Sequence, residues 1–195
     1  LGETISEKGG VINLSLDGSI LLSAMAAFAI SYQSHSLLLG FAGGALVGAM
    51  MAACVGFFSV FLGQSQVAVG FVLTLTAKDL AYFLGNPYAR LYGPQAGMTP
   101  IPWLQDVPVL GPIFFHQSVP AYLSLLLVHF AWWYLYKTPM GLSLRAIGEH
   151  PEAAYARGTK TRAIQFWYTV VGGLLVGLAV ATFSLCTKTC WGRPH

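Results

Sequence analysis

Charged residues are scarce in this sequence. Lys and Arg number 10 and Asp and Glu number 7, so charged residues make up 9% of 195 positions, against about 25% in ordinary soluble domains. So few charges could not cover the surface of a soluble fold of this size. Hydrophobic residues reach 55%, which also excludes a disordered chain. The composition indicates a protein surrounded largely by the lipid bilayer, and the thinly spread basic residues argue against a nucleic-acid partner.

Cysteines are also few, and the common catalytic motifs are missing. Three cysteines do not make a disulfide framework. Cys54 is predicted to be a small buried hydrophobic residue, whereas Cys186 and Cys190 either pair or remain two thiols. The sequence has no phosphate loop, zinc-type His-Glu spacing or nucleophile elbow. We therefore expect no catalytic residue and no metal site, so energy for uphill transport has to come from an ion gradient or another subunit.

Apolar runs of about twenty residues, the length that crosses a bilayer as a helix, recur along the chain. They cover residues 14–32, 37–62, 67–84, 119–136 and 164–185. The sequence therefore predicts an all-α fold, a polytopic bundle of about five transmembrane helices that forms a single domain over residues 1–195. Because the sequence does not begin with Met and stops at Trp191 to His195, we expect it to be a fragment of a longer protein.

Basic residues predict which connections face the cytoplasm. Half of the 10 lie in the connection 137–163, namely Lys137, Arg145, Arg157, Lys160 and Arg162. The connection 85–118 contains Arg90 as its single basic residue. We therefore place 137–163 in the cytoplasm, together with the N-terminal residues and the turn at 63–66, and we place 85–118 outside.

The predicted external loop, 85–118, is rich in proline and still apolar. Proline disfavours regular helix across most of it. Trp103, Phe114 and Phe115 are among its large apolar residues, which a disordered linker would lack. We expect a packed cap over the outer helix ends, and the docking of an external partner is the alternative.

Small residues recur at the spacing that helices use to pack in lipid. Gly40, Gly44 and Gly48 are four apart in one apolar run, and Gly173 and Gly177 are four apart in another. Such faces let two helices approach closely. The pattern predicts a packed bundle but does not indicate what the bundle carries.

Polar residues at membrane depth are the candidates for a solute path. Asn13 and Asp17 are four apart and are predicted to share a helix face, in a segment (9–18) where glycines break the start of the helix. Asn13, Ser15 and Asp17 are therefore predicted to lie near the path. The alternative is an N-cap with a solvated carboxylate at the membrane surface.

Lys78 and Asp79 are the other charges within an apolar run. A charge in hydrocarbon costs several kcal/mol unless it finds a partner or reaches the interface. Adjacent residues point about 100° apart on a helix, so the two do not form a good ion pair. Lys78 either extends to the interface or the pair faces a polar cavity.

The connection 137–163 contains the signals of one short helix outside the membrane. Pro151 suits a first helical turn, and Glu152 suits the positive end of the helix dipole. Gly158 suits the end of a helix. We therefore predict a helix of about two turns, rich in alanine. It either seats in a cleft on a partner or is a plain surface connector.

Three stretches of the sequence resemble one protein family. Glu152-Ala153-Ala154, three further residues and then Gly158 resemble the motif of ABC importer permeases that forms a coupling helix, which docks on a cytoplasmic ATPase. Residues 2–18 and 141–151 resemble two signatures of the permeases for branched-chain amino acids, simple sugars and nucleosides. The resemblance extends over nearly the whole chain and is nearest to the nucleoside and simple-sugar branch.

This resemblance implies a permease subunit of an ATP-driven importer, a multi-pass protein of the plasma (inner) membrane that moves a small polar solute by alternating access. It implies three partners: cytoplasmic ATP-binding subunits, a second permease subunit in a homo- or heterodimer, and an external solute-binding protein. The chain itself would bind no cofactor and would not be an enzyme, because the partner subunit uses the ATP. Coupling to the ATPase is then expected at Glu149, Glu152, Ala153, Ala154 and Gly158.

The sequence departs from the family pattern at a few positions. His150 stands where the family usually has Asn, and Asp17 where it has Glu or Gly. Lys78 and Asp79 replace small uncharged residues, so no family role is assigned to them. A branched-chain amino acid is the alternative solute, and a channel or secondary transporter that needs no ATPase is the alternative to an importer. A membrane scaffold without transport is the third possibility.

Overall fold

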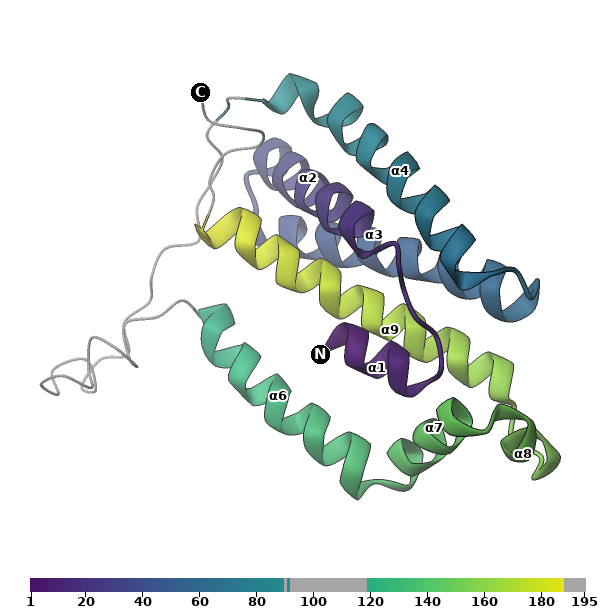
Figure 1. The fold of residues 1–195 in the computed structure, drawn as a ribbon. Helices are drawn as coiled ribbons and strands as arrows, with labels where there is room; N and C mark the ends of the chain where they lie inside the picture. Colours follow the sequence, from purple (N-terminus) through teal and green to yellow (C-terminus); the bar gives the residue numbers. More distant parts are fainter. Residues whose placement is uncertain (90, 92–118, 188–195) are drawn as a thin grey trace, which may run out of the picture.

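The computed structural model describes residues 1–89, 91 and 119–187, and these ranges are built from helices (Figure 1). The helices are α1 (Gly2–Lys8), α2 (Leu16–Ser34), α3 (Leu37–Gly56), α4 (Gln66–Gly85), α6 (Val119–Lys137), α7 (Pro139–Glu149), α8 (Pro151–Ala156) and α9 (Thr161–Thr182). One π-helical turn, Phe57–Phe61, extends α3, and another, Phe183–Thr187, extends α9, whereas a 3-10 turn, Asn86–Tyr88, ends α4. The predicted all-α fold is confirmed.

Five long helices, α2, α3, α4, α6 and α9, coincide with the five apolar runs of the sequence. In the described part of the chain, three spans are long and apolar enough to cross a membrane: Leu37–Phe61, Gln66–Tyr88 and Thr161–Cys186. The other two helices have 19 residues each. Serines and Asp17 reduce the hydropathy of α2.

Each end of the bundle brings together connections that the distribution of basic residues predicted to lie on the same side of the membrane. At one end, Gln165 of α9 donates to the Gly9 carbonyl at 2.9 Å, and Gln66 of α4 donates to the Gly10 carbonyl at 3.4 Å. The N-terminal segment, the turn before α4 and the 137–163 connection therefore meet there (Figure 1). At the other end, the Tyr32 ring lies 6.2 Å from the Tyr88 ring, measured between centroids. The side of the membrane that each end faces stays a prediction.

The glycines of α3 and α9 pack against each other. A Cβ added at Gly48 would lie 2.9 Å from the Gly177 Cα, and one added at Gly173 would lie 2.5 Å from the Gly48 carbonyl oxygen. The two helix backbones are therefore in direct contact, as the small-residue spacing predicted. Gly40 faces α2 instead, where its Cβ would lie 2.9 Å from the Ala27 carbonyl oxygen.

Helix α4 packs on α2 and lies at the outer edge of the bundle (Figure 1). Its contact face is small, with Ala77 and Ala81 buried. Lys78 is half-buried and Asp79 is exposed, so the two charges do not share an environment. Most of the predicted external loop 85–118, and Cys190 with any bond to Cys186, lie outside the described residues. Cys54 on α3 is exposed, so the prediction that it is buried is wrong.

Candidate functional site

Helix α7 connects three parts of the bundle. It begins with Thr138, whose hydroxyl accepts a hydrogen bond from the Gly141 N–H at 3.1 Å, and with Pro139 in its first turn. Leu144 and Ile147 are fully buried, and α7 contacts α6, α1 and α9. Sequence analysis missed this helix, although Thr-Pro followed by apolar residues three positions apart indicates one.

Tight contacts attach the start of α7 to the end of α6. The Thr138 hydroxyl donates to the Tyr134 carbonyl at 2.6 Å. A Cβ at Gly141 would lie 2.6 Å from the Leu135 carbonyl oxygen, so the two backbones touch. The Arg145 guanidinium lies 4.8 Å from the centroid of the Tyr136 ring, a cation–π geometry. Helices α6 and α7 therefore form a firm corner.

Helix α8 follows directly and confirms the predicted short helix. Pro151 occupies its first turn and Glu152 follows. Gly158 ends α8 with φ of +85°, a backbone conformation that residues with a side chain rarely adopt. The Gly158 N–H donates to the Tyr155 carbonyl at 2.8 Å, and the Thr159 N–H donates to the Ala154 carbonyl at 3.2 Å.

The surface of α8 is open. Tyr155 is 71% exposed, and Glu152, Ala153 and the preceding Glu149 are exposed, whereas Ala154 is half-buried. Nothing lies within 4 Å of a Cβ added at Gly158. The residues predicted to couple to an ATPase thus lie together at one end of the molecule (Figure 1), and their role stays a prediction.

The second candidate region is the irregular segment between α1 and α2, in which Val11, Asn13 and Ser15 are buried and Ile12 and Leu14 are exposed. Gly10 has φ of +82°, so the predicted break at the glycines is confirmed. Asn13 Oδ1 accepts hydrogen bonds from the Ser15 N–H at 3.1 Å and from the Ser15 hydroxyl at 2.7 Å. Asn13 is 4% exposed and Ser15 is fully buried. The Asn13 side chain therefore organises the start of α2.

The prediction that Asn13 and Asp17 share a helix face is wrong. Helix α2 begins at Leu16, so Asn13 lies before it. Asn13 is buried, whereas Asp17 is exposed in the first helical turn. The four-residue spacing misled because the glycines end α1 and the chain runs without helix through Asn13. Of the three predicted path residues, Asp17 is exposed, and Asn13 and Ser15 are buried.

Glu3 of α1 supports the same segment. Its Oε1 accepts a hydrogen bond from the Asn13 N–H at 3.1 Å. Burial raises the pKa of Glu3 above its ordinary value, and the hydrogen bond from Asn13 opposes that shift. The nearby Glu7 carboxylate also raises this pKa. The Glu3 carboxyl group therefore holds the segment between α1 and α2, and its burial costs desolvation free energy.

A row of hydroxyls follows the buried side of α2. We name Ser15, Ser19, Ser23 and Ser31 the serine face; all four are at most 2% exposed. Within the described residues, the Ser23 and Ser31 hydroxyls have no hydrogen-bond partner, an arrangement that costs free energy in a packed interior. Sequence analysis missed this face, although the spacing of 15, 19 and 23 indicates it.

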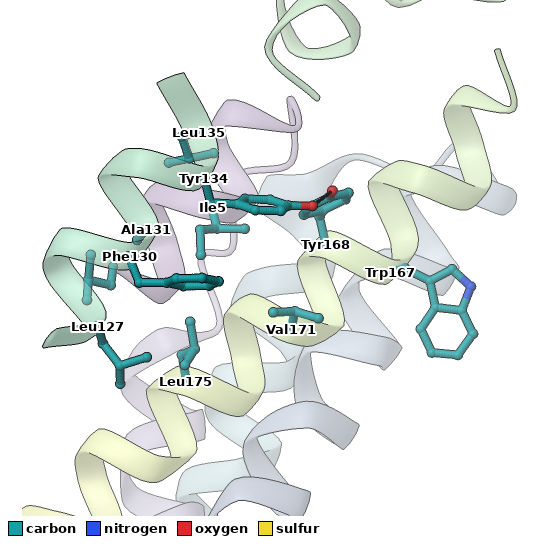
Figure 2. A pocket seen from close by; sticks show the side chains of 11 residues that line it. Ile5, Leu127, Phe130, Ala131, Tyr134, Leu135, Trp167, Tyr168, Val171 and Leu175 are labelled. Carbon is teal, nitrogen blue, oxygen red and sulfur yellow. Dashed lines mark hydrogen bonds between the residues drawn. The ribbon is translucent and has the colours of Figure 1, made fainter. Parts of the chain in front are cut away.

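A groove of about 380 Å³ separates α6 from α1 and α9. Its walls include Ile5, Phe130 and Leu175 (Figure 2). The Tyr134 and Tyr168 hydroxyls form a hydrogen bond of 2.5 Å between α6 and α9, and Figure 2 shows Trp167 pointing away from α6. Because its lining is almost entirely apolar, the groove is a poor site for a polar solute.

Comparison with known proteins identifies the family. Residues 1–191 match the family described as the permease component of the branched-chain amino acid transport system. The chain is 32% identical to a putative glucose ABC transporter permease of Haloferax volcanii, with 98% of this chain and 59% of the relative covered. It is 30% identical to a nucleoside ABC transporter permease of Lactococcus lactis subsp. cremoris, with 94% and 62% covered.

A third relative, the guanosine ABC transporter permease of Bacillus subtilis, is 31% identical, with 94% of this chain and 61% of the relative covered. The chain thus spans 59% to 62% of the length of these three relatives. No solved structure matches it. The resemblance stated from the sequence is confirmed, and the chain belongs to the family of permease components of branched-chain amino acid transport systems, whose relatives here are sugar and nucleoside permeases.

Proposed function

We propose that this chain is part of the membrane-spanning permease subunit of an ATP-driven ABC importer. It moves a nucleoside or a simple sugar across the plasma membrane by alternating access. One observation carries the proposal: α8 presents Glu152, Ala153 and Tyr155 on an open surface, next to a helix that contacts α6, α1 and α9.

Helix α8 is attached to the bundle in a way that lets it transmit the movement of a partner subunit. A permease that lacks its own ATPase needs a firm element between two moving bodies. Helix α8 contacts α7 and α9, and α7 is buried through Leu144 and Ile147. A displacement of α8 by a partner therefore reaches three helices at once. We propose Glu149, Glu152, Ala153, Ala154 and Gly158 as the coupling residues.

The solute class rests on chemistry and on the relatives. The relatives are named for glucose, nucleosides and guanosine, all rich in hydroxyl groups. Asp17 offers an exposed carboxylate that accepts hydrogen bonds from the hydroxyl groups of such solutes. We propose that Asn13 and Ser15 shape the start of this path. A branched-chain amino acid is the second candidate, because the description of the matched family names it.

The proposal implies three partners. ATP-binding subunits meet the surface around α8, a second permease subunit completes the transporter as a homo- or heterodimer, and an external protein delivers the solute. ATP is bound and hydrolysed by the partner subunits, and this chain supplies no cofactor site.

Uptake by proteoliposomes tests the proposal. The full-length permease is reconstituted with its ATP-binding subunits and solute-binding protein, and uptake of radiolabelled guanosine, glucose and leucine is measured with ATP or a non-hydrolysable analogue inside. We expect uptake of guanosine or glucose with ATP alone. Uptake that is equally fast with both nucleotides supports a channel or secondary transporter and contradicts the proposal.

Asp17→Ala tests the placement of the path in the same assay. We expect the half-saturating solute concentration to rise about tenfold, because a hydrogen bond to a charged group is worth roughly 1.5–3 kcal/mol. Protein stability changes little, since Asp17 is exposed. Asp79→Ala, an exposed carboxylate on α4, is the matched control and retains wild-type uptake. Equal uptake by both variants contradicts the role of Asp17.

A further inference from the structure

Two glutamines hold the irregular segment 9–15 against the bundle. Gln66, the first residue of α4, accepts a hydrogen bond from the Ile12 N–H at 2.9 Å and donates to the Gly10 carbonyl at 3.4 Å. Gln165 of α9 donates to the Gly9 carbonyl at 2.9 Å. Both glutamine side chains are half-buried. Backbone groups of one short segment are therefore bonded to two different transmembrane helices.

The same segment lies directly against α7. A Cβ added at Gly148 of α7 would lie 3.0 Å from the Lys8 carbonyl carbon and 3.2 Å from the Gly10 nitrogen. The contact is equally close when measured from Gly10, because a Cβ added at Gly10 would lie 3.3 Å from the Gly148 Cα. Backbone thus touches backbone, and a displacement of α7 has to move segment 9–15 or open a gap.

On its other side, segment 9–15 continues into α2. Val11 is 1% exposed and Asn13 is 4% exposed. Asn13 Oδ1 binds the Ser15 N–H and hydroxyl, and the Ser19 hydroxyl donates to the Ser15 carbonyl at 2.9 Å. Separating these buried polar groups is costly. The segment and the start of α2 therefore move as one unit.

We propose that Gln66 and Gln165 are positioning residues that make segment 9–15 a firm link between the pair α7–α8 and the start of α2. This inference rests on the proposed function and extends it, because it names how a movement of α8 reaches the solute path. Without the two side chains, the segment keeps the bonds of Asn13 to Glu3 and of Leu14 to Thr74. It loses those at Gly9, Gly10 and Ile12, and the glycines let it bend there. Helix α7 then moves without carrying α2 with it.

Hydrogen–deuterium exchange tests this link. The full-length permease is assembled with its ATP-binding subunits in nanodiscs, and exchange is measured with and without ATP plus vanadate. In the wild type, we expect ATP to change exchange both in peptides covering 151–158 and in peptides covering 9–19. In the double variant Gln66→Ala, Gln165→Ala, we expect the change at 151–158 to remain. We expect the ATP-dependent change in exchange at 9–19 to fall roughly tenfold, because the variant loses three hydrogen bonds.

Two further variants separate positioning from general damage. Gln64→Ala removes an exposed side chain that bonds the Leu62 carbonyl in its own turn at 3.4 Å, and we expect a wild-type response from it. Gln66→Glu keeps a side-chain oxygen that accepts the hydrogen bond from the Ile12 N–H. We expect this variant to retain part of the exchange response to ATP at 9–19. Unchanged exchange along α3 and α9 shows that each variant is folded.

The outcomes distinguish the link from the function on which it rests. A wild-type response at 9–19 in the double variant overturns the role of the glutamines and leaves the proposed function intact. A wild-type permease that shows no ATP response at 151–158 contradicts the proposed function itself. If the double variant does not fold, Gln165→Ala alone is measured in the same way, and a full response at 9–19 overturns the inference.

Discussion

Replacing Gly158 by Val is expected to abolish ATP-driven uptake while the ATPase continues to hydrolyse ATP. Gly158 has φ of +85°, and a β-branched residue in that conformation costs on the order of 1–3 kcal/mol. The end of α8 then opens, because the Gly158 N–H no longer reaches the Tyr155 carbonyl. The variant stays in the membrane, since nothing packs on this position. Paired assays of uptake and phosphate release check the expectation.

The chain offers a matched control for this variant. Gly63, in the turn before α4, has φ of +66° and, like Gly158, has no atom within 4 Å of an added Cβ. Gly63→Val therefore introduces a similar backbone strain at the same end of the bundle but outside α8. We expect it to retain coupled uptake. Loss of coupling in both variants would assign the effect to strain at this end of the molecule instead of to α8.

Gly48→Leu is expected to have the largest effect on stability. A side chain at Gly48 meets the backbone of Gly173 and Gly177, which cannot rotate away as a side chain does. Overpacking of this kind costs roughly 1–3 kcal/mol, and the unfolding midpoint of the purified protein in detergent is expected to fall by roughly 2–12 °C. Thermal unfolding followed by circular dichroism measures the shift.

Ala42→Leu is the control for that substitution. Ala42 lies on the same helix, α3, and is exposed, so a leucine there enlarges the surface that faces lipid. We expect its unfolding midpoint to match that of the wild type. If Gly48→Leu also leaves the midpoint unchanged, the contact between α3 and α9 is not what holds the bundle together.

The sequence predicted the fold wherever one local signal was sufficient. Runs of apolar residues located the five long helices, and Pro151, Glu152 and Gly158 located α8. Glycine spacing predicted a closely packed bundle, since small residues let helix backbones approach each other. In each case the deciding interaction lies within one helix or is repeated at a fixed spacing.

Other features depend on contacts between distant segments and were missed or misread. Asn13 and Asp17 have helical spacing, but the backbone at Gly10 takes a positive φ and the Asn13 side chain binds Ser15, the residue just before α2. Gln66 and Gln165 bind a segment more than fifty positions away, and no local pattern marks a glutamine for that purpose. The conformation of the segment that holds the predicted path residues could therefore not be derived from local sequence patterns, and their role in a path stays a prediction.

Photocrosslinking from α8 tests the central claim most directly, namely that α8 is the contact with an ATP-binding subunit. A benzophenone amino acid replaces Tyr155, which is 71% exposed, and in a second protein it replaces Phe83, which is 78% exposed near the far end of α4. We expect a crosslink to the ATP-binding subunit from position 155 and none from position 83. A transporter that takes up solute with ATP yet gives no crosslink from position 155 would contradict the claim.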